Sequence, residues 1–82
     1  MNLVMPGRVA QVFGEILKID PSRISDETAP DNTPQWDSLA TMRLVVAVQD
    51  AFSVQLSITE IMAMRTVGLV RSILRRKGVM ET

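Results

Sequence analysis

This chain has few side chains that could act as nucleophiles, general bases or metal ligands, and the main candidate is one serine hydroxyl. The sequence contains no histidine and no cysteine, which excludes disulfides, thiolate metal sites, cysteine nucleophiles and histidine general bases. No pair of carboxylates falls on one face of a predicted helix. The remaining candidate is Ser38, which stands between Asp37 and Leu39 where a polar loop meets an apolar run. We therefore expect no catalytic residue, no metal site and no enzyme that acts alone.

The first element that must position this hydroxyl is an amphipathic helix over about residues 6–19. Its apolar residues recur at the spacing of one helical face: Val9, Val12, Phe13, Ile16 and Leu17. Pro6 suits the start of a helix, and Pro21 forces the residue before it out of the helical region.

A long connection over residues 21–36 separates this helix from Ser38. It contains Pro21, Pro30 and Pro34 among polar residues, so we expect no regular structure there. A loop of this length in a small domain is typical of a functional segment when it is anchored. Ile24 and Trp36 are the residues that we expect to anchor it to the helices.

Asp37 and Ser38 then open a second helix, because either side chain can cap the first free backbone N–H groups. The run from Leu39 to Val48 is mostly apolar, which predicts a central helix that is buried on most sides. At about 100° per residue, one stripe still faces solvent. That stripe contains Leu39, Arg43, Val46 and Asp50.

The rest of the chain predicts an extended connector and two more helices. The connector alternates apolar and polar residues from Phe52 to Leu56. A capping box formed by Ser57 and Glu60 starts a short third helix over about residues 58–63. Thr66 caps a last helix, with Val67, Val70, Ile73 and Leu74 on its inner side. Gly78 ends this helix, after Arg75, Arg76 and Lys77 in the last turn.

Taken together, the long polar loop, Asp37-Ser38-Leu39 at the start of an apolar helix, the alternation after Phe52 and Thr66-Val67 resemble the acyl carrier protein family. The likeness covers roughly residues 9–74. It implies an all-α fold, a four-helix bundle of acyl-carrier type with a long first loop and a short third helix.

The resemblance also implies a cofactor and partners. Ser38 would carry covalent 4′-phosphopantetheine from coenzyme A, and Asp37 would help to place the metal-bound coenzyme A on the transferase. The chain would hold acyl groups as thioesters. Leu39, Arg43, Val46 and Asp50 would contact partner enzymes. The implied partners are a phosphopantetheinyl transferase, an acyl-loading ligase or transferase, and acyl-processing enzymes of a fatty-acid, polyketide or specialised pathway.

Two departures from the family pattern favour a specialised carrier. Many fatty-acid carriers have a glycine shortly before Asp-Ser-Leu, where this chain has Gln35 and Trp36. Many also have an acidic second helix, which Arg43 interrupts here. A peptidyl or aminoacyl carrier remains an alternative. Another is an unmodified helical interaction module in which Ser38 is only a helix cap.

Length and charge bound the remaining possibilities. The 82 residues suit one domain, 1–82, and the formal net charge is zero. Zero charge argues against nucleic-acid binding, although Arg71, Arg75, Arg76 and Lys77 form a basic C-terminal cluster. We find no secretory signal and no apolar run of membrane-spanning length, and we expect a cytoplasmic monomer without a membrane partner.

A set of apolar residues in the second half could line a space for an acyl chain, but plain core is the preferred interpretation. The set is Met42, Val45, Ile58, Ile61, Met62, Met64 and Val67.

Overall fold

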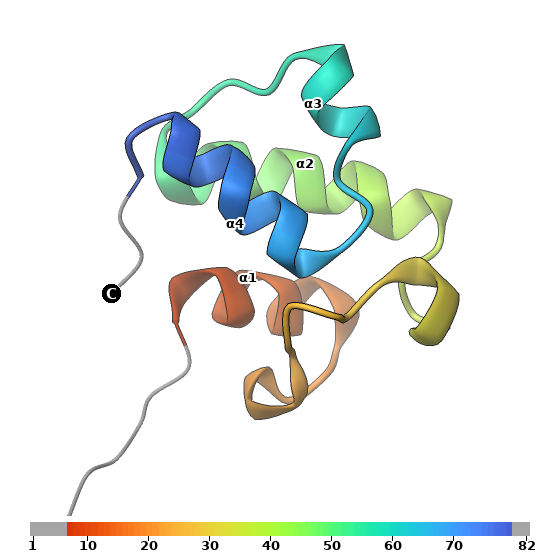
Figure 1. The fold of residues 1–82 in the computed structure, drawn as a ribbon. Helices are drawn as coiled ribbons and strands as arrows, with labels where there is room; N and C mark the ends of the chain where they lie inside the picture. Colours follow the sequence, from red (N-terminus) through yellow and green to blue (C-terminus); the bar gives the residue numbers. More distant parts are fainter. Residues whose placement is uncertain (1–6, 80–82) are drawn as a thin grey trace, which may run out of the picture.

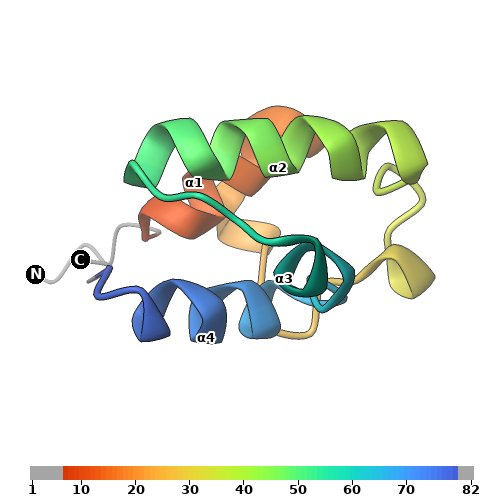
Figure 2. The same ribbon diagram turned by 90° about the horizontal axis from the view of Figure 1, so that it is seen from above.

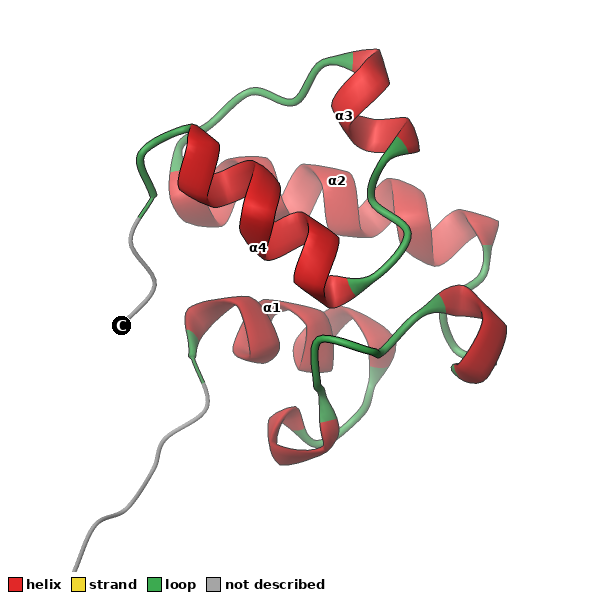
Figure 3. Cartoon of the chain, viewed as in Figure 1, coloured by secondary structure: helices red, strands yellow, loops and turns green. Residues whose placement is uncertain are grey.

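The computed structural model describes residues 7–79 and shows four α-helices with no strand in that range. The helices are α1 (Arg8–Leu17), α2 (Ser38–Phe52), α3 (Ile58–Met62) and α4 (Val67–Arg76). Helices and loops account for the whole described chain (Figure 3). The predicted all-α bundle with a short third helix is confirmed.

The helices enclose one core beneath the long first loop. α1 packs on α2 and runs in the opposite direction, while α2 and α4 run the same way on opposite sides of the molecule (Figures 1 and 2). The predicted inner faces of α1 and α4 supply most of the core. Its fully buried large side chains are Phe13, Leu17, Leu44, Val9, Val48, Val67 and Val70. Val12 and Ile16 are half-buried at the edge of this core.

The two predicted loop anchors are confirmed. Ile24 and Trp36 are 9% and 2% exposed, and the Trp36 ring meets Phe13 edge to face at 5.3 Å between centroids. Such aromatic pairs stabilise beyond the area that they bury. The loop is therefore fixed to α1 immediately before α2 begins.

The expectation that residues 21–36 lack regular structure is wrong. Two short 3₁₀ helices, η1 (Pro21–Arg23) and η2 (Pro30–Asn32), each begin at a proline. Proline has the φ that a first helical turn needs, and its missing N–H costs nothing at that position. The Asn32 side chain holds η2, because its Oδ1 accepts from Ala29 N and its amide donates to the Glu27 carbonyl.

The loop is also joined to the start of α4. Val67 N donates to the Thr28 carbonyl and Gly68 N to the Asp26 carbonyl, both at 3.0 Å. The Asp26 side chain in turn forms an ion pair with Arg71. A side chain at position 68 would meet the Asp26 backbone oxygen at 3.2 Å, so glycine permits this close approach. These contacts bring the far end of the sequence against the first loop.

α2 is not buried on most sides, which corrects the prediction for this helix. Its buried residues are Ala40, Leu44 and Val48, at four-residue intervals along one face. The other side of the helix faces solvent. A small bundle has too few elements to cover α2 all round.

The connector after α2 begins later than the alternation predicted. Phe52 is the last residue of α2 rather than an extended residue, and Ser53 ends the helix in the left-handed conformation with φ 53°. Arg8 lies over the Phe52 ring at 4.9 Å, and its guanidinium donates to the Ala51 carbonyl at 2.7 Å. These contacts hold the last turn of α2 against the start of α1.

The predicted starts and stops of the later helices are confirmed, with α3 one residue shorter than expected. Ser57 and Glu60 form the capping box, Thr66 caps α4, and Gly78 follows it at φ 83°. Glu60 also pairs with Lys77 at 3.0 Å. The backbone N–H of Ser57 and this lysine hold the pKa of Glu60 below its ordinary value.

α1 ends at Leu17, two residues before the predicted end. Lys18 adopts the left-handed conformation with φ 60°, and Ile19 N donates back to the Gly14 carbonyl at 3.0 Å. This turn redirects the chain before Pro21. The predicted start at Pro6 lies outside the described residues. Within residues 7–79, no helix has the length and hydrophobicity to cross a membrane.

Candidate functional site

Ser38 is the first residue of α2 and is exposed to solvent. Asp37 is the N-cap, and its Oδ1 accepts a hydrogen bond from Ala40 N at 2.8 Å. Asp37 therefore caps the helix, and the Ser38 hydroxyl lies at the exposed helix start. A side chain at this position can be modified without disturbing the core.

Three side chains fix where α2 begins. The Trp36 indole N–H donates to Thr41 Oγ1 at 2.9 Å, and the Thr41 hydroxyl donates to the Asp37 carbonyl at 3.1 Å. Because Trp36 is buried against Phe13, this chain of bonds connects the core to the residue before Ser38. Sequence reasoning missed Thr41; its place five residues after the only tryptophan is the signal that could have found it.

The environment of Ser38 suits a phosphate ester. The first N–H groups of a helix have no partner within the helix, and the helix dipole favours negative charge at this end. Here the Asp37 side chain accepts the hydrogen bond from Ala40 N–H, while Ser38 and Leu39 are both exposed. A phosphodiester on the Ser38 hydroxyl would extend into solvent beside the favourable end of the helix.

The four predicted contact residues lie along one exposed line of α2, which we call the α2 stripe: Leu39, Arg43, Val46 and Asp50. Leu39 is 61% exposed and Val46 57%, and Arg43 and Asp50 are also exposed. The stripe starts beside Ser38 and runs about three turns along the helix. The structure thus brings all six predicted site residues onto α2 and its cap.

The expectation that the second apolar set is plain core is wrong for three of its members. Met42 is 66% exposed, Ile58 77% and Met62 74%. Met42 adjoins the α2 stripe, and the other two lie one turn apart on α3. α3 has only five residues, and none of them is buried. Met64 and Val67 are buried as predicted, while Val45 and Ile61 are half-buried.

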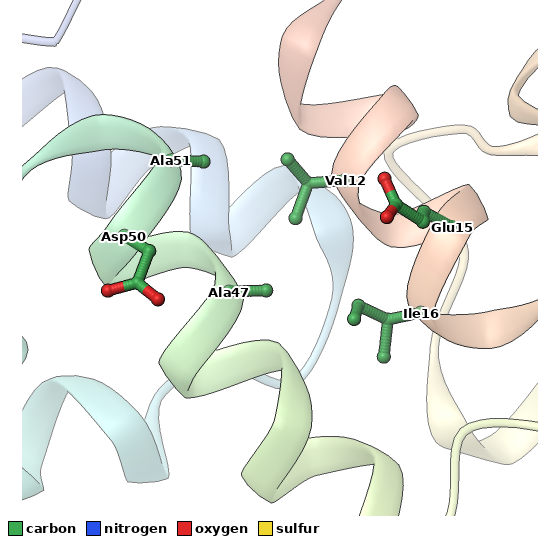
Figure 4. Close-up of a pocket in the computed structure, with 6 residues that line it drawn as sticks. All are labelled: Val12, Glu15, Ile16, Ala47, Asp50 and Ala51. Carbon is green, nitrogen blue, oxygen red and sulfur yellow. The ribbon is translucent and has the colours of Figure 1, made fainter.

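A shallow hollow follows the seam between α1 and α2, beside the α2 stripe. One part, of about 300 Å³, lies between Val12, Glu15 and Ile16 of α1 and Ala47, Asp50 and Ala51 of α2 (Figure 4). A neighbouring part of about 500 Å³ shares Ile16, Ala47 and Asp50 and extends to Met42. The hollow is open and mostly apolar.

Two features bear on other kinds of site. Among residues 7–79, no group of three or more acidic, histidine or cysteine side chains is placed to hold a metal ion. In the basic C-terminal cluster, Arg71 pairs with Asp26 and Lys77 with Glu60. These internal pairs reduce the positive charge that the cluster offers to a nucleic acid.

A comparison with known families gives a match that covers most of the chain. The model described as "phosphopantetheine attachment site" matches residues 7–71. That range contains α1, the first loop, Ser38, α2 and α3. A comparison with curated proteins gives no match.

Proposed function

The chain belongs to the phosphopantetheine attachment site family, and we propose that it carries acyl groups on an arm attached to Ser38. The domain that defines this family is the site to which 4′-phosphopantetheine is covalently attached. The observation that carries the proposal is that the matched range includes an exposed serine at a capped helix start. When bound, the arm supplies the thiol that this cysteine-free chain lacks, and acyl groups are held there as thioesters.

The chain's own part in loading is to present one hydroxyl. The bond between Ser38 Oγ and phosphorus forms as the diphosphate bond of coenzyme A breaks. Adenosine 3′,5′-bisphosphate leaves, and the hydroxyl proton passes to the transferase. The Asp37 carboxylate is adjacent to this hydroxyl in the chain and would help to hold the metal-bound coenzyme A. Thr41 and Trp36 contribute indirectly, because their hydrogen bonds hold the Asp37 backbone in place.

Partner enzymes would dock on the α2 stripe next to the arm. Leu39 and Val46 offer apolar surface, while Arg43 and Asp50 offer one charge of each sign. Apolar anchors at helical spacing are a common mode of helix recognition. The proposed partners are a phosphopantetheinyl transferase, a loading ligase or transferase, and acyl-processing enzymes. The carrier then works by tethering, which raises the effective concentration of its cargo near each of them.

The charges on α2 favour a specialised acyl carrier. Arg43 and Asp50 are the charged residues of this helix, so its face offers little to an enzyme with a basic docking patch. A peptidyl or aminoacyl carrier is the second candidate, and the same absence of an acidic face favours it. Loading of the phosphopantetheinylated chain by an acyl ligase, against loading by an amino-acid-activating domain, separates the two.

The test of attachment is intact mass after incubation with coenzyme A, magnesium and a broad-specificity phosphopantetheinyl transferase. We expect the parent chain to gain one phosphopantetheine and Ser38→Ala to gain none. Ser57→Ala is the matched control, because it also removes a serine at a helix start. Its cap loss costs about 1 kcal/mol, and it should still be loaded. No gain on folded parent protein with several transferases would refute the proposal.

A further inference from the structure

Methionine supplies the only sulfur in this chain, because the sequence has six methionines and no cysteine. Three of the methionines lie among the described residues, and their exposures differ widely. Met42 on α2 is 66% exposed and Met62 on α3 is 74% exposed, whereas Met64 is 4% exposed. Two thioether side chains are therefore open to reagents in solution, and the third is enclosed in the core.

Met42 lies at the centre of the apolar surface that begins beside Ser38. Leu39, Met42 and Val46 stand at positions i, i+3 and i+7, which places them within about 60° of one another around α2. All three are more than half exposed. This is the spacing at which an apolar helix face enters a hydrophobic groove of a partner. Met42 also lines the larger part of the hollow, together with Val46 and Ile16. A partner that covers the α2 stripe would therefore cover Met42.

A methionine at this position can change the surface from apolar to polar. The sulfur lone pair attacks one oxygen of hydrogen peroxide, and the S–O bond forms as the O–O bond breaks. The proton of the transferred oxygen passes to the leaving hydroxide, which becomes water. Sulfur is thus oxidised by two electrons, and the peroxide is reduced. The product, methionine sulfoxide, is polar and is reduced again by methionine sulfoxide reductases. A sulfoxide oxygen buried in an apolar groove without a hydrogen-bond donor disfavours binding.

From these observations we propose that Met42 is an oxidation site, and that its sulfoxide weakens the docking of partner enzymes while the fold and Ser38 stay intact. The proposal rests on the docking role of the α2 stripe and adds regulation to it. Met62 reacts with the same reagent, but it lies on α3 rather than on the stripe, so its oxidation leaves docking unchanged. Met64 reacts only when the core opens locally.

The first test measures the oxidation rate of each methionine in the unmodified chain with dilute hydrogen peroxide. Trypsin releases Met42 in the peptide of residues 24–43, and Met62 with Met64 in that of residues 44–65. Tandem mass spectrometry separates the last two. Met42 and Met62 should form sulfoxides at least about tenfold faster than Met64. A Met42 that reacts as slowly as Met64 would overturn the proposal.

The second test measures docking before and after oxidation, once the peroxide has been removed. The KM of a phosphopantetheinyl transferase for the chain should rise about fivefold, with kcat changed by less than about twofold. Titration calorimetry of the chain with the transferase, without coenzyme A, provides a readout that needs no transfer reaction. Its Kd should rise by the same factor of about five. Treatment with methionine sulfoxide reductases should restore the untreated values.

Two matched variants assign the effect to one sulfur. Met62→Leu removes the other exposed thioether and should respond to peroxide like the parent, while the KM of Met42→Leu should no longer respond. Both changes conserve volume, and circular dichroism establishes that each variant is folded before and after treatment. A response that persists in Met42→Leu, or a parent with oxidised Met42 and an unchanged KM, would overturn the inference alone. An untreated parent that takes no phosphopantetheine would contradict the proposed function itself, and the inference with it.

Discussion

Replacing Thr41 by valine tests whether the Trp36–Thr41–Asp37 hydrogen bonds fix the start of α2. Valine has nearly the shape of threonine but cannot accept the indole N–H at 2.9 Å. Trp36 is 2% exposed, so its N–H would lose its partner with little access to water. An unpaired buried donor costs about 1–3 kcal/mol. Because Thr41 itself is only half-buried, we expect a loss of about 1–2 kcal/mol of unfolding free energy.

Thermal unfolding measures this loss, since 1 kcal/mol corresponds to a Tm change of about 4–8 °C in a domain of this size. Thr59→Val is the matched control, because Thr59 is an exposed helical threonine. It should change stability by less than about 0.5 kcal/mol.

A double-mutant cycle separates the hydrogen bond from packing. Trp36→Phe removes the donor, and Thr41→Val removes the acceptor. In the double variant, the two losses should fall short of additivity by about 1 kcal/mol. Additive losses, or a Thr41→Val variant as stable as the parent, would refute the reasoning.

Three further perturbations follow from the structure. Gly14→Ala should cost about 1–3 kcal/mol, because a Cβ there would lie 2.6 Å from the Ile19 carbonyl oxygen; urea unfolding with an unchanged midpoint concentration would contradict this. The backbone N–H at the start of α3 and Lys77 lower the pKa of Glu60 below 4.5. The contribution of the Glu60 carboxylate to folding stability is therefore fully present above about pH 4.5 and is lost as the pH falls through the lowered pKa. The Tm of Glu60→Gln should vary less than the parent's below about pH 4.5, and equal slopes would contradict the assignment. Asp37→Asn keeps the cap and should leave stability within about 0.5 kcal/mol, yet slow phosphopantetheine loading about tenfold if the carboxylate holds metal-bound coenzyme A. Loading at the parent's kcat/KM would exclude that role.

The parts of the fold that depend on local pattern could be predicted from the sequence. The capping box of Ser57 and Glu60 and the cap at Thr66 involve residues three positions apart, which the chain order alone shows. The inner faces of α1 and α4 follow from their helical periodicity. The exposed Ser38 also follows, because a helix start after a polar loop faces solvent.

The parts that depend on tertiary packing could not be read in this way. In α2 the charged residues Arg43 and Asp50 indicate one exposed line, but the apolar residues beside that line do not reveal how far the neighbouring helices cover them, so the exposure of Met42 was missed. Ile58 and Met62 were missed for a related reason, because a five-residue helix can lie on the surface. The pairing of Arg71 with Asp26 joins residues 45 positions apart, and no sequence pattern indicates it.

The functional site likewise has one part that the local sequence pattern predicts and another that depends on tertiary packing. Its hydroxyl and its cap were predictable from a short motif at a helix start. The Thr41 bond that holds them depends on where the buried Trp36 ring lies. The docking role of the α2 stripe stays a prediction, since exposure alone does not identify what covers a surface.

The most direct test of the central claim is to locate the modification by tandem mass spectrometry of a tryptic digest of loaded protein. Cleavage after Arg23 and Arg43 yields one peptide that contains both Ser25 and Ser38. The account predicts fragment ions that place a single phosphopantetheine on Ser38, with Ser25 unmodified. A phosphopantetheine on Ser25 or on any other peptide, or none after complete incubation of folded protein, would contradict it.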